Sequence, residues 1–213
     1  MFLCAASLGV PISGIAPALE YLVSTDRHHG FESFEEELLL LAADFSGSLV
    51  EALTQPFRLR FQSVNGSVEH IPDYLLLTDD TPWLIDVRPS ARIEPEDEVK
   101  FAAAAEVALI AGWNYAVVAG WHDHVVGLID TLSAGRRHLT DPLRLQEQLL
   151  LAAEDGPQPF GTLVRRCSLE AVARAHAIHL LWHRQLGLQI SGPLTDASTI
   201  RLSLSRRPAS GSW

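Results

Sequence analysis

Three charged residues near the middle of the chain have the types and spacing of a site that can hold a phosphodiester. They are Asp73, Asp86 and Arg88, all within residues 69–89. Asp86 and Arg88 are two positions apart in an extended apolar run, so their side chains share one face of a strand. Pairing of this run with the one that follows Asp73 can bring Asp73 beside Asp86. Two carboxylates and a cation at one sheet end suit the binding of a divalent metal ion and a phosphodiester.

The segment that must position these residues has the pattern of a β-hairpin. Residues 74–77 and 83–87 are short apolar runs. Between them, the Asp and Pro residues of Thr-Asp-Asp-Thr-Pro, at 78–82, favour a turn. The alternative interpretation is a surface hairpin whose charges are simply solvated.

Each acidic side chain of the hairpin has two interpretations. Asp73 follows Pro72 at a strand start, where an Asp often makes only a turn hydrogen bond, and we favour ligation of Mg²⁺ instead. Asp86 lies within an apolar strand, where a charge costs free energy unless it is paired or bound to a metal. Pairing with Arg88 is one solution, and metal ligation is the one we favour. Because Mg²⁺ keeps several waters, two or three carboxylates suffice to hold it.

The basic residues divide into one strong candidate and several weaker ones. Arg88 can neutralise a scissile phosphate, but its pKa above about 12 prevents it from acting as a base, which leaves metal-bound hydroxide as the nucleophile. Lys100, the only lysine, is expected near the start of a helix, as a solvated residue rather than a second phosphate ligand. His70, His122 and His124 suggest a metal. The latter two fall in an expected loop without a companion cluster, which favours a surface loop.

Composition limits the class of protein. In 213 residues, 47% hydrophobic and 20% charged content indicates a globular chain that can bury a real core. A net charge of −10 is not the signature of general nucleic-acid binding, so any DNA contact must use local patches, helped by a metal or a partner. Two cysteines are too few for a disulfide framework and fit a reducing cytoplasm. Residues 1–23 are apolar without a basic start, which favours a packed segment over a signal peptide. No uninterrupted apolar run reaches membrane-spanning length.

Local signals predict a mixed α/β core before residue 136. Ser33 followed by Glu36 is a capping-box pattern that opens a helix, and Asp44 begins the turn that closes it. Asn65-Gly66 is a strong hairpin signal, and Gly112 fits the end of a helix. The expected order is a helix at 32–43, strands at 57–62, 68–71, 74–77 and 83–87, a helix at 96–111, a strand at 114–119 and a helix at 125–133. This order predicts a mixed sheet flanked by helices.

The rest of the chain has the element order of a winged helix-turn-helix. After a boundary near residues 136–142, we expect helices at 143–153, 160–167 and 169–186, then strands at 188–190 and 199–204. Trp182, at helical spacing with two leucines, is most simply a core residue. Arg165, Arg166 and Arg174 can contact phosphate from this module, and docking of a protein is an equally good interpretation.

With these elements placed, residues 31–202 resemble the TnsA-like endonuclease subunit of heteromeric bacterial transposases. The hairpin carries a PD-(D/E)xK nuclease motif, as Pro72-Asp73 and then Asp86-Val87-Arg88, with arginine in place of the motif's lysine. The other matching parts are Glu32-Ser33-x-x-Glu36, Asp44-Phe45, Gln55-Pro56-Phe57, His70-Ile71-Pro72-Asp73-Tyr74, Gly112-Trp113-Asn114-Tyr115, His179-Leu180-Leu181-Trp182 and Pro193-Leu194. Their order and spacing together carry the resemblance.

The resemblance implies a Mg²⁺-dependent DNA endonuclease, with Mn²⁺ as a substitute, that cuts at transposon ends in the cytoplasm. A separate DDE-type transposase subunit would handle the opposite strand, and an AAA+ ATPase regulator is a further partner. By position, Glu36, Asp73, Asp86 and Arg88 fall on the family's catalytic positions, and the three carboxylates on its metal ligands. The implied organisation is an N-terminal segment at 1–28, a restriction-endonuclease-like domain at 29–138, a winged-helix-like domain at 139–204 and a disordered tail at 205–213.

Two other classes of function remain open. A non-catalytic adaptor that keeps the nuclease fold and binds the transposase or its ATPase regulator is favoured by Arg88, whereas Glu36, Asp73 and Asp86 together favour the enzyme. A transcription regulator that uses only the C-terminal module is the third option. The acidic net charge and the complete N-terminal α/β core count against it.

Overall fold

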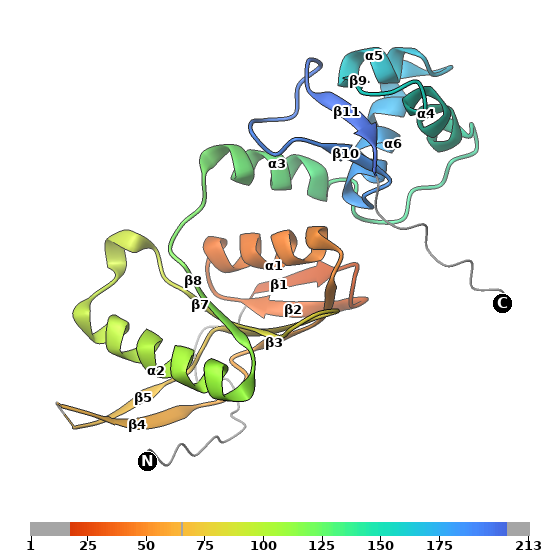
Figure 1. Cartoon of the computed structure of the whole chain (residues 1–213). Helices are drawn as coiled ribbons and strands as arrows, with labels where there is room; N and C mark the ends of the chain where they lie inside the picture. Colours follow the sequence, from red (N-terminus) through yellow and green to blue (C-terminus); the bar gives the residue numbers. More distant parts are fainter. Residues whose placement is uncertain (1–17, 65, 204–213) are drawn as a thin grey trace. The chain divides into compact units, whose positions relative to one another are not determined.

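The computed structural model describes residues 18–64 and 66–203, which divide into two compact units (Figure 1). The first unit ends at Trp121 and the second begins at His122. The expectations for the apolar N-terminal segment up to residue 17, and for the tail from 205, lie outside the described residues. Among the described residues, no helix is both long enough and apolar enough to cross a membrane.

The first unit is a mixed α/β structure built on a four-strand sheet of order β3-β6-β7-β8. β3, β6 and β7 are antiparallel neighbours, and β8 lies parallel to β7. The hairpins β1-β2 and β4-β5 form separate two-strand sheets. The elements are β1 (Ala18–Leu22), β2 (Arg27–Phe31), α1 (Phe34–Ser46), β3 (Leu49–Thr54), β4 (Leu59–Ser63), β5 (Gly66–His70), β6 (Tyr74–Thr78), β7 (Trp83–Val87), α2 (Pro95–Ala111) and β8 (Asn114–Val118). The predicted hairpin and mixed sheet are therefore confirmed.

Helices α1 and α2 cover opposite faces of the four-strand sheet (Figure 1). The α1 side buries Leu39, Leu40, Tyr74, Leu76 and Ile85, and the α2 side buries Leu59, Leu75, Leu84, Ala104 and Ala108. Successive residues of β6 alternate between the two faces, as the pleat of a strand requires. Burial of each such leucine stabilises the fold by about 1.5–3 kcal/mol. A strand that is apolar on both faces is thereby held in one register.

Helix α1 begins as predicted but continues further. The hydroxyl of Ser33 accepts a hydrogen bond from the N–H of Glu36 at 3.2 Å. We predicted a turn at Asp44, and this was wrong, because Asp44 is helical and only 1% exposed. Its carboxylate accepts the N–H groups of Val23 and Ser24 at 3.0 and 2.7 Å, so it ties α1 to the β1-β2 turn. The helix ends instead at Gly47, whose φ of 74° is in the left-handed region that favours glycine.

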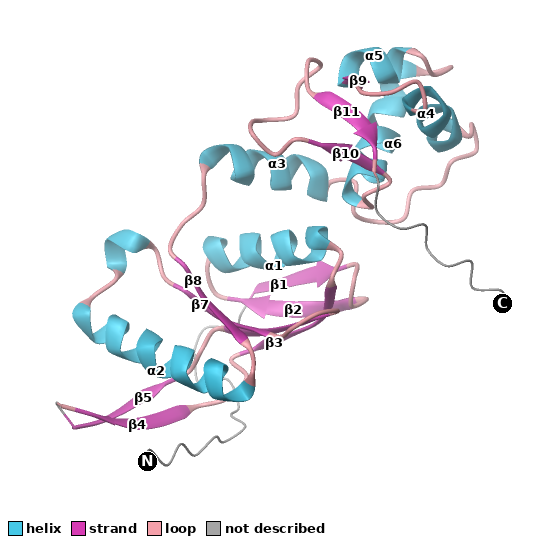
Figure 2. Ribbon diagram, in the orientation of Figure 1, coloured by secondary structure: helices cyan, strands magenta, loops and turns pink. Residues whose placement is uncertain are grey.

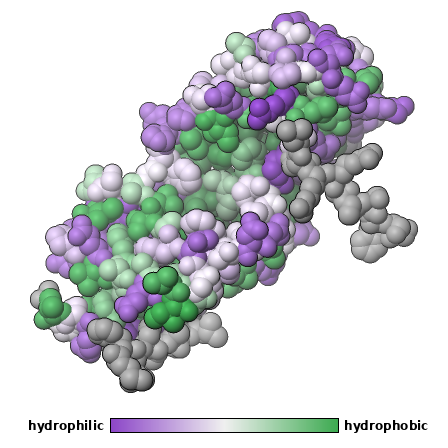
Figure 3. All heavy atoms as spheres, in the orientation of Figure 1, coloured by the Kyte–Doolittle hydropathy of each residue, from purple (hydrophilic) through white to green (hydrophobic). Residues whose placement is uncertain are grey.

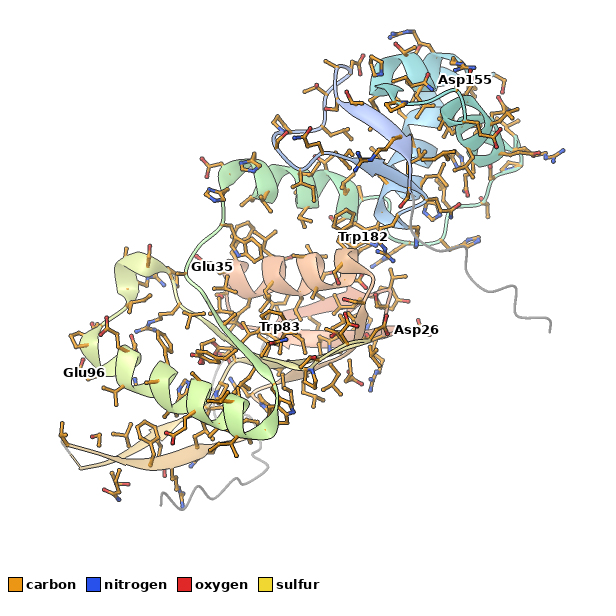
Figure 4. All side chains as sticks on the ribbon, viewed as in Figure 1. Asp26, Glu35, Trp83, Glu96, Asp155 and Trp182 are labelled. Carbon is orange, nitrogen blue, oxygen red and sulfur yellow. The ribbon has the colours of Figure 1, made fainter. Side chains whose placement is uncertain are left out.

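Helix α2 follows its prediction closely. Pro95 occupies the first turn, where its missing N–H costs nothing. The N–H of Glu94 donates to the carboxylate of Asp97 at 3.2 Å, and Gly112 ends the helix. Figure 4 labels Glu35 in the first turn of α1 and Glu96 in that of α2, so both helices begin with the acidic residues that the helix dipole favours.

The second unit consists of helices and a three-strand antiparallel sheet of order β10-β11-β9 (Figure 2). Trp182 is 2% exposed, as expected for a core residue. The elements are α3 (Asp123–Ser133), α4 (Leu145–Ala153), β9 (Gln158–Pro159), α5 (Phe160–Arg165), α6 (Glu170–Trp182), β10 (Leu186–Leu188) and β11 (Thr199–Leu202). The division between units precedes α3, because α3 packs on α6. The boundary expected from the sequence follows that helix.

Two features of the second unit differ from the predictions. Helix α6 ends at Trp182 and not at Leu186, because Arg184 has a φ of 55° and Leu186 pairs with Leu202 in β10. The sequence analysis also missed β9, which has only two residues. On the face shown in Figure 3, hydrophobic residues reach the surface in small groups among hydrophilic ones.

Asp44→Ala should destabilise the protein. Both N–H groups of the β1-β2 turn would lose their charged acceptor, which should lower the free energy of unfolding by about 2–4 kcal/mol. Denaturant unfolding measures this change. Asp80→Ala, at an exposed turn position, is the matched control and should change it by less than about 0.5 kcal/mol. Equal effects of the two substitutions would show that Asp44 does not tie the turn.

Candidate functional site

Asp73 and Asp86 lie side by side at the end of the β6-β7 hairpin. Tyr74 pairs with Ile85, so the next position outward places Asp73 opposite Asp86. Residues that are opposite in an antiparallel pair share a face of the sheet. The carboxylate of Asp73 accepts the N–H of Val87 at 2.6 Å, and its carbonyl accepts the N–H of Gln55 at 2.8 Å. The first predicted feature of the site, two adjacent carboxylates, is therefore present.

Asp86 is almost fully buried, with 2% exposure, and has two partners. The hydroxyl of Tyr115, on β8, donates to Oδ2 at 2.7 Å. The imidazole Nε2 of His70 lies 2.9 Å from Oδ1. The two atoms are close enough for an ion pair, but Nε2 of His70 makes no hydrogen bond. The predicted alternative, an ion pair of Asp86 with Arg88, is replaced by contacts with Tyr115 and His70.

Glu36 reaches the site from the α1 side of the sheet. Its Oε2 accepts the N–H of Glu32 at 2.9 Å and lies 3.2 Å from the hydroxyl of Tyr74. Its Oε1 accepts the hydroxyl of Ser33 at 3.0 Å. Asp73 immediately precedes Tyr74, the first residue of β6, so the two side chains point to opposite faces. Glu36 therefore acts on Asp73 through its charge, while its oxygens are engaged by groups at the start of α1.

The electrostatics of the site are those of crowded carboxylates. Burial, then the nearby charges of Asp86 and Glu36, raise the pKa of Asp73 to about 7, although the N–H of Val87 and the charge of His70 oppose the shift. Burial and the hydrogen bond to Asp86 raise the pKa of Tyr115, so its hydroxyl stays protonated as a donor. The site thus carries more negative charge than its surroundings neutralise.

Arg88 and Lys100 both contact Asp97 in the first turn of α2. The Nε of Arg88 lies 3.2 Å from one oxygen of Asp97 and donates to the carbonyl of Arg92 at 3.1 Å. The ammonium of Lys100 donates to the other oxygen at 3.1 Å. Burial alone would raise the pKa of Asp97, but hydrogen bonds from Lys100 and from the N–H of Glu94 outweigh it and lower the pKa. We expected Arg88 beside Asp86, and its guanidinium turns instead to α2.

Two of the three predicted carboxylates are arranged in a way that suits a hard divalent cation. Asp73 and Asp86 offer carboxylate oxygens beside one another in a site with surplus negative charge, and Mg²⁺ needs only one or two carboxylates plus water. Among the described residues, however, no three His, Cys, Asp or Glu side chains form a group that could hold a metal ion. The predicted set Glu36, Asp73 and Asp86 is therefore not gathered as one ligand group, because the cap of α1 engages Glu36.

The remaining candidates lie in the second unit. His122 and His124 stack with ring centroids 5.5 Å apart, at the start of α3. The three arginines already have partners there: Arg165 contacts Thr162, Arg166 pairs with Asp155, and Arg174 pairs with Asp196 and Glu170. Sequence reasoning missed the contacts of His70 and Tyr115 with Asp86, although both residues lie in motifs that carried the resemblance.

Asp73→Asn should stabilise the metal-free protein at high pH. The acid form of Asp73 holds its proton in the folded protein up to a pKa of about 7, whereas in an unfolded chain it loses it near about 4. Folding therefore takes up a proton between these values, and the parent loses stability as pH rises through this window, by up to about 1.4 kcal/mol per unit. Asparagine removes this loss and can still accept the N–H of Val87.

Denaturant unfolding of the parent and Asp73→Asn, in chelator from pH 4 to 8, measures the effect. The difference in free energy of unfolding should be small at pH 4 and grow to a few kcal/mol at pH 8. A difference that does not depend on pH would show that Asp73 has an ordinary pKa.

Comparisons with known proteins add no assignment. No protein-family model matches the chain, and no curated protein matches it in sequence. Any functional conclusion therefore rests on the contacts, burial and charges of the side chains described above.

Proposed function

We propose that the protein is the DNA endonuclease subunit of a heteromeric transposase, and that it hydrolyses a phosphodiester at transposon ends with a divalent cation. The observation that carries this proposal is the pair Asp73 and Asp86. These two carboxylates lie on one sheet face, fixed by Val87 and Tyr115, and burial and mutual repulsion raise the pKa of Asp73. A site that holds surplus negative charge at a cost in stability is typical of a functional site.

The arrangement of elements agrees with this activity. Helix α1 precedes an antiparallel set of strands, and α2 crosses from β7 to the parallel strand β8. This order supports the restriction-endonuclease-like fold that the motif implies. In the second unit, α4, β9, α5, α6, β10 and β11 follow one another in the order of a winged helix, with β9 as the strand between the first two helices.

Each side chain has a part in the proposed reaction. Asp73 and Asp86 would hold Mg²⁺, and the ion when bound supplies a Lewis acid that activates water and polarises the phosphate. Tyr115 orients one oxygen of Asp86, so that the other faces the site. The side chain of Arg88 is 43% exposed and pairs with the buried Asp97. Lys100 and the N–H of Glu94 remain as partners of Asp97 when Arg88 turns to bind phosphate.

Partners must supply most of the DNA affinity. The chain carries a net charge of −10, and Arg166 and Arg174 of the second unit are already paired with acids. We therefore place the protein in a cytoplasmic assembly with a DDE-type transposase and, at target selection, an AAA+ ATPase regulator. The winged-helix-like unit is the part that would dock on DNA or on these subunits.

A non-catalytic adaptor is the second candidate function, and one observation favours it. Arg88 and Lys100 share Asp97 and neither contacts Asp86, so the cation of the nuclease motif is not in place. An adaptor would keep the fold and the partners without cleavage. The two candidates differ in whether the carboxylates matter for cutting.

Asp86→Asn should abolish strand cleavage by the full assembly of transposase, transposon-end duplex and Mg²⁺. The substitution removes a carboxylate at nearly constant volume, and asparagine can still accept the hydroxyl of Tyr115. Asp80→Asn, in the exposed turn of the same hairpin, is the matched control and should cut normally. If Asp86→Asn cuts at the parental rate while remaining bound in the assembly, the protein is an adaptor.

Arg88→Ala should lower the cleavage rate by about 10²-fold, because it removes a group that stabilises developing charge on the phosphate. Arg88→Lys should retain activity, since lysine carries the same charge at the position of the nuclease motif. Arg92→Ala is the control, because it removes a neighbouring exposed guanidinium and leaves the carbonyl that Arg88 contacts. Equal rates for Arg88→Ala and Arg92→Ala would exclude Arg88 from the reaction.

A further inference from the structure

His70 contains a buried nitrogen that the fold leaves without a hydrogen bond. The three buried histidines of the described chain each make hydrogen bonds: His29 with Ala52 and Thr25, His176 with Gln146, and His179 with Gly135. Nε2 of His70 makes none, and it lies beside the most buried carboxylate of the candidate site. A buried polar atom without a hydrogen bond costs free energy, which points to a bound group as the partner of this nitrogen.

The contact of His70 with Asp86 has the spacing of two ligands and is not a hydrogen bond. Nε2 of His70 and Oδ1 of Asp86 are 2.9 Å apart. Two adjacent ligands of an octahedral ion with bonds of about 2.1 Å are about 3.0 Å apart. Ligands of one ion direct their lone pairs at a third point rather than at each other. Tyr115 occupies Oδ2 of Asp86, which leaves Oδ1 for this point.

We propose that His70 and Asp86 are neighbouring ligands of one divalent ion, and that the site prefers Mn²⁺ or Co²⁺ to Mg²⁺. The inference deepens the proposed nuclease function and rests on it. Imidazole nitrogen suits transition metals, whereas Mg²⁺ strongly prefers oxygen. Water and phosphate oxygens complete the coordination, and Asp73 acts through a bound water, because no three His, Cys, Asp or Glu side chains of the described residues are grouped closely enough to hold one ion.

The test is spectroscopic and uses the full-length protein loaded with Mn²⁺. The parent should show modulation of the Mn²⁺ electron spin echo by an imidazole ¹⁴N nucleus, and His70→Gln should not. His138→Gln is the control, because it makes the same substitution at an exposed histidine of the second unit. Tyr115→Phe should keep the nitrogen signal, since it removes the hydrogen bond to Asp86 but neither ligand.

Calorimetry of metal binding supplies an independent measure. The ratio of Mn²⁺ to Mg²⁺ affinity should fall by about tenfold or more in His70→Gln, because loss of a direct ligand costs at least as much as loss of an outer partner. His138→Gln should leave the ratio unchanged. Circular dichroism melts in chelator confirm that each variant is folded.

The outcomes separate this inference from the proposed function. Suppose that the parent binds Mn²⁺, that Asp86→Asn does not, and that the parent's spectrum shows no nitrogen modulation. This result overturns the role of His70 and leaves the nuclease proposal standing. A nitrogen signal that depends on His70, in a protein whose assembly does not cut DNA, supports the metal site and overturns the nuclease function. Failure of the parent to bind Mn²⁺ overturns the inference.

Discussion

The register in which β6 pairs with β7 is the constraint on which the rest of the structure depends. With Tyr74 opposite Ile85, Asp73 and Asp86 come to lie together on one face. A slip of one residue would move one of them to the other face and would turn apolar side chains away from their helix. Packing on both faces holds the register: Tyr74 and Ile85 lie on the α1 side, and Leu84 on the α2 side. The same burial that stabilises the sheet therefore fixes the geometry of the two carboxylates.

That burial also creates the charge problem of the site. Two carboxylates side by side, away from water, repel one another, and the fold supplies few donors to them: the N–H of Val87 for Asp73 and the hydroxyl of Tyr115 for Asp86. The raised pKa of Asp73 is the consequence. Proteins tolerate such local destabilisation where a bound cation relieves it. The removal of two neighbouring carboxylates from water thus links the structure to the proposed chemistry.

Packing, and not distance along the sequence, decides which basic side chain contacts the carboxylate pair Asp73 and Asp86. Arg88, two residues from Asp86, turns to Asp97 at the start of α2, where Lys100 joins it. His70, at the end of β5, is the basic residue that contacts Asp86. The result is an inner contact, made by the imidazole of His70 with Asp86, and an outer pair of half-buried cations, Arg88 and Lys100, at Asp97. An ion bound at the inner contact and a phosphate drawn to the outer cations would occupy different parts of the same surface.

Local signals determined the hairpin, the starts of α1 and α2, and the pairing of Asp73 with Asp86, because caps, turn residues and a period of two act over a few residues. The partners of the charged groups depended on tertiary structure. The carboxylate of the helical Asp44 binds the distant β1-β2 turn, and Glu36 is engaged by its own helix cap and by Tyr74. Which cation meets Asp86 is decided where β5 ends and α2 begins. A hydrogen bond between residues far apart in the chain leaves no periodic trace in the sequence, so only the folded chain reveals it.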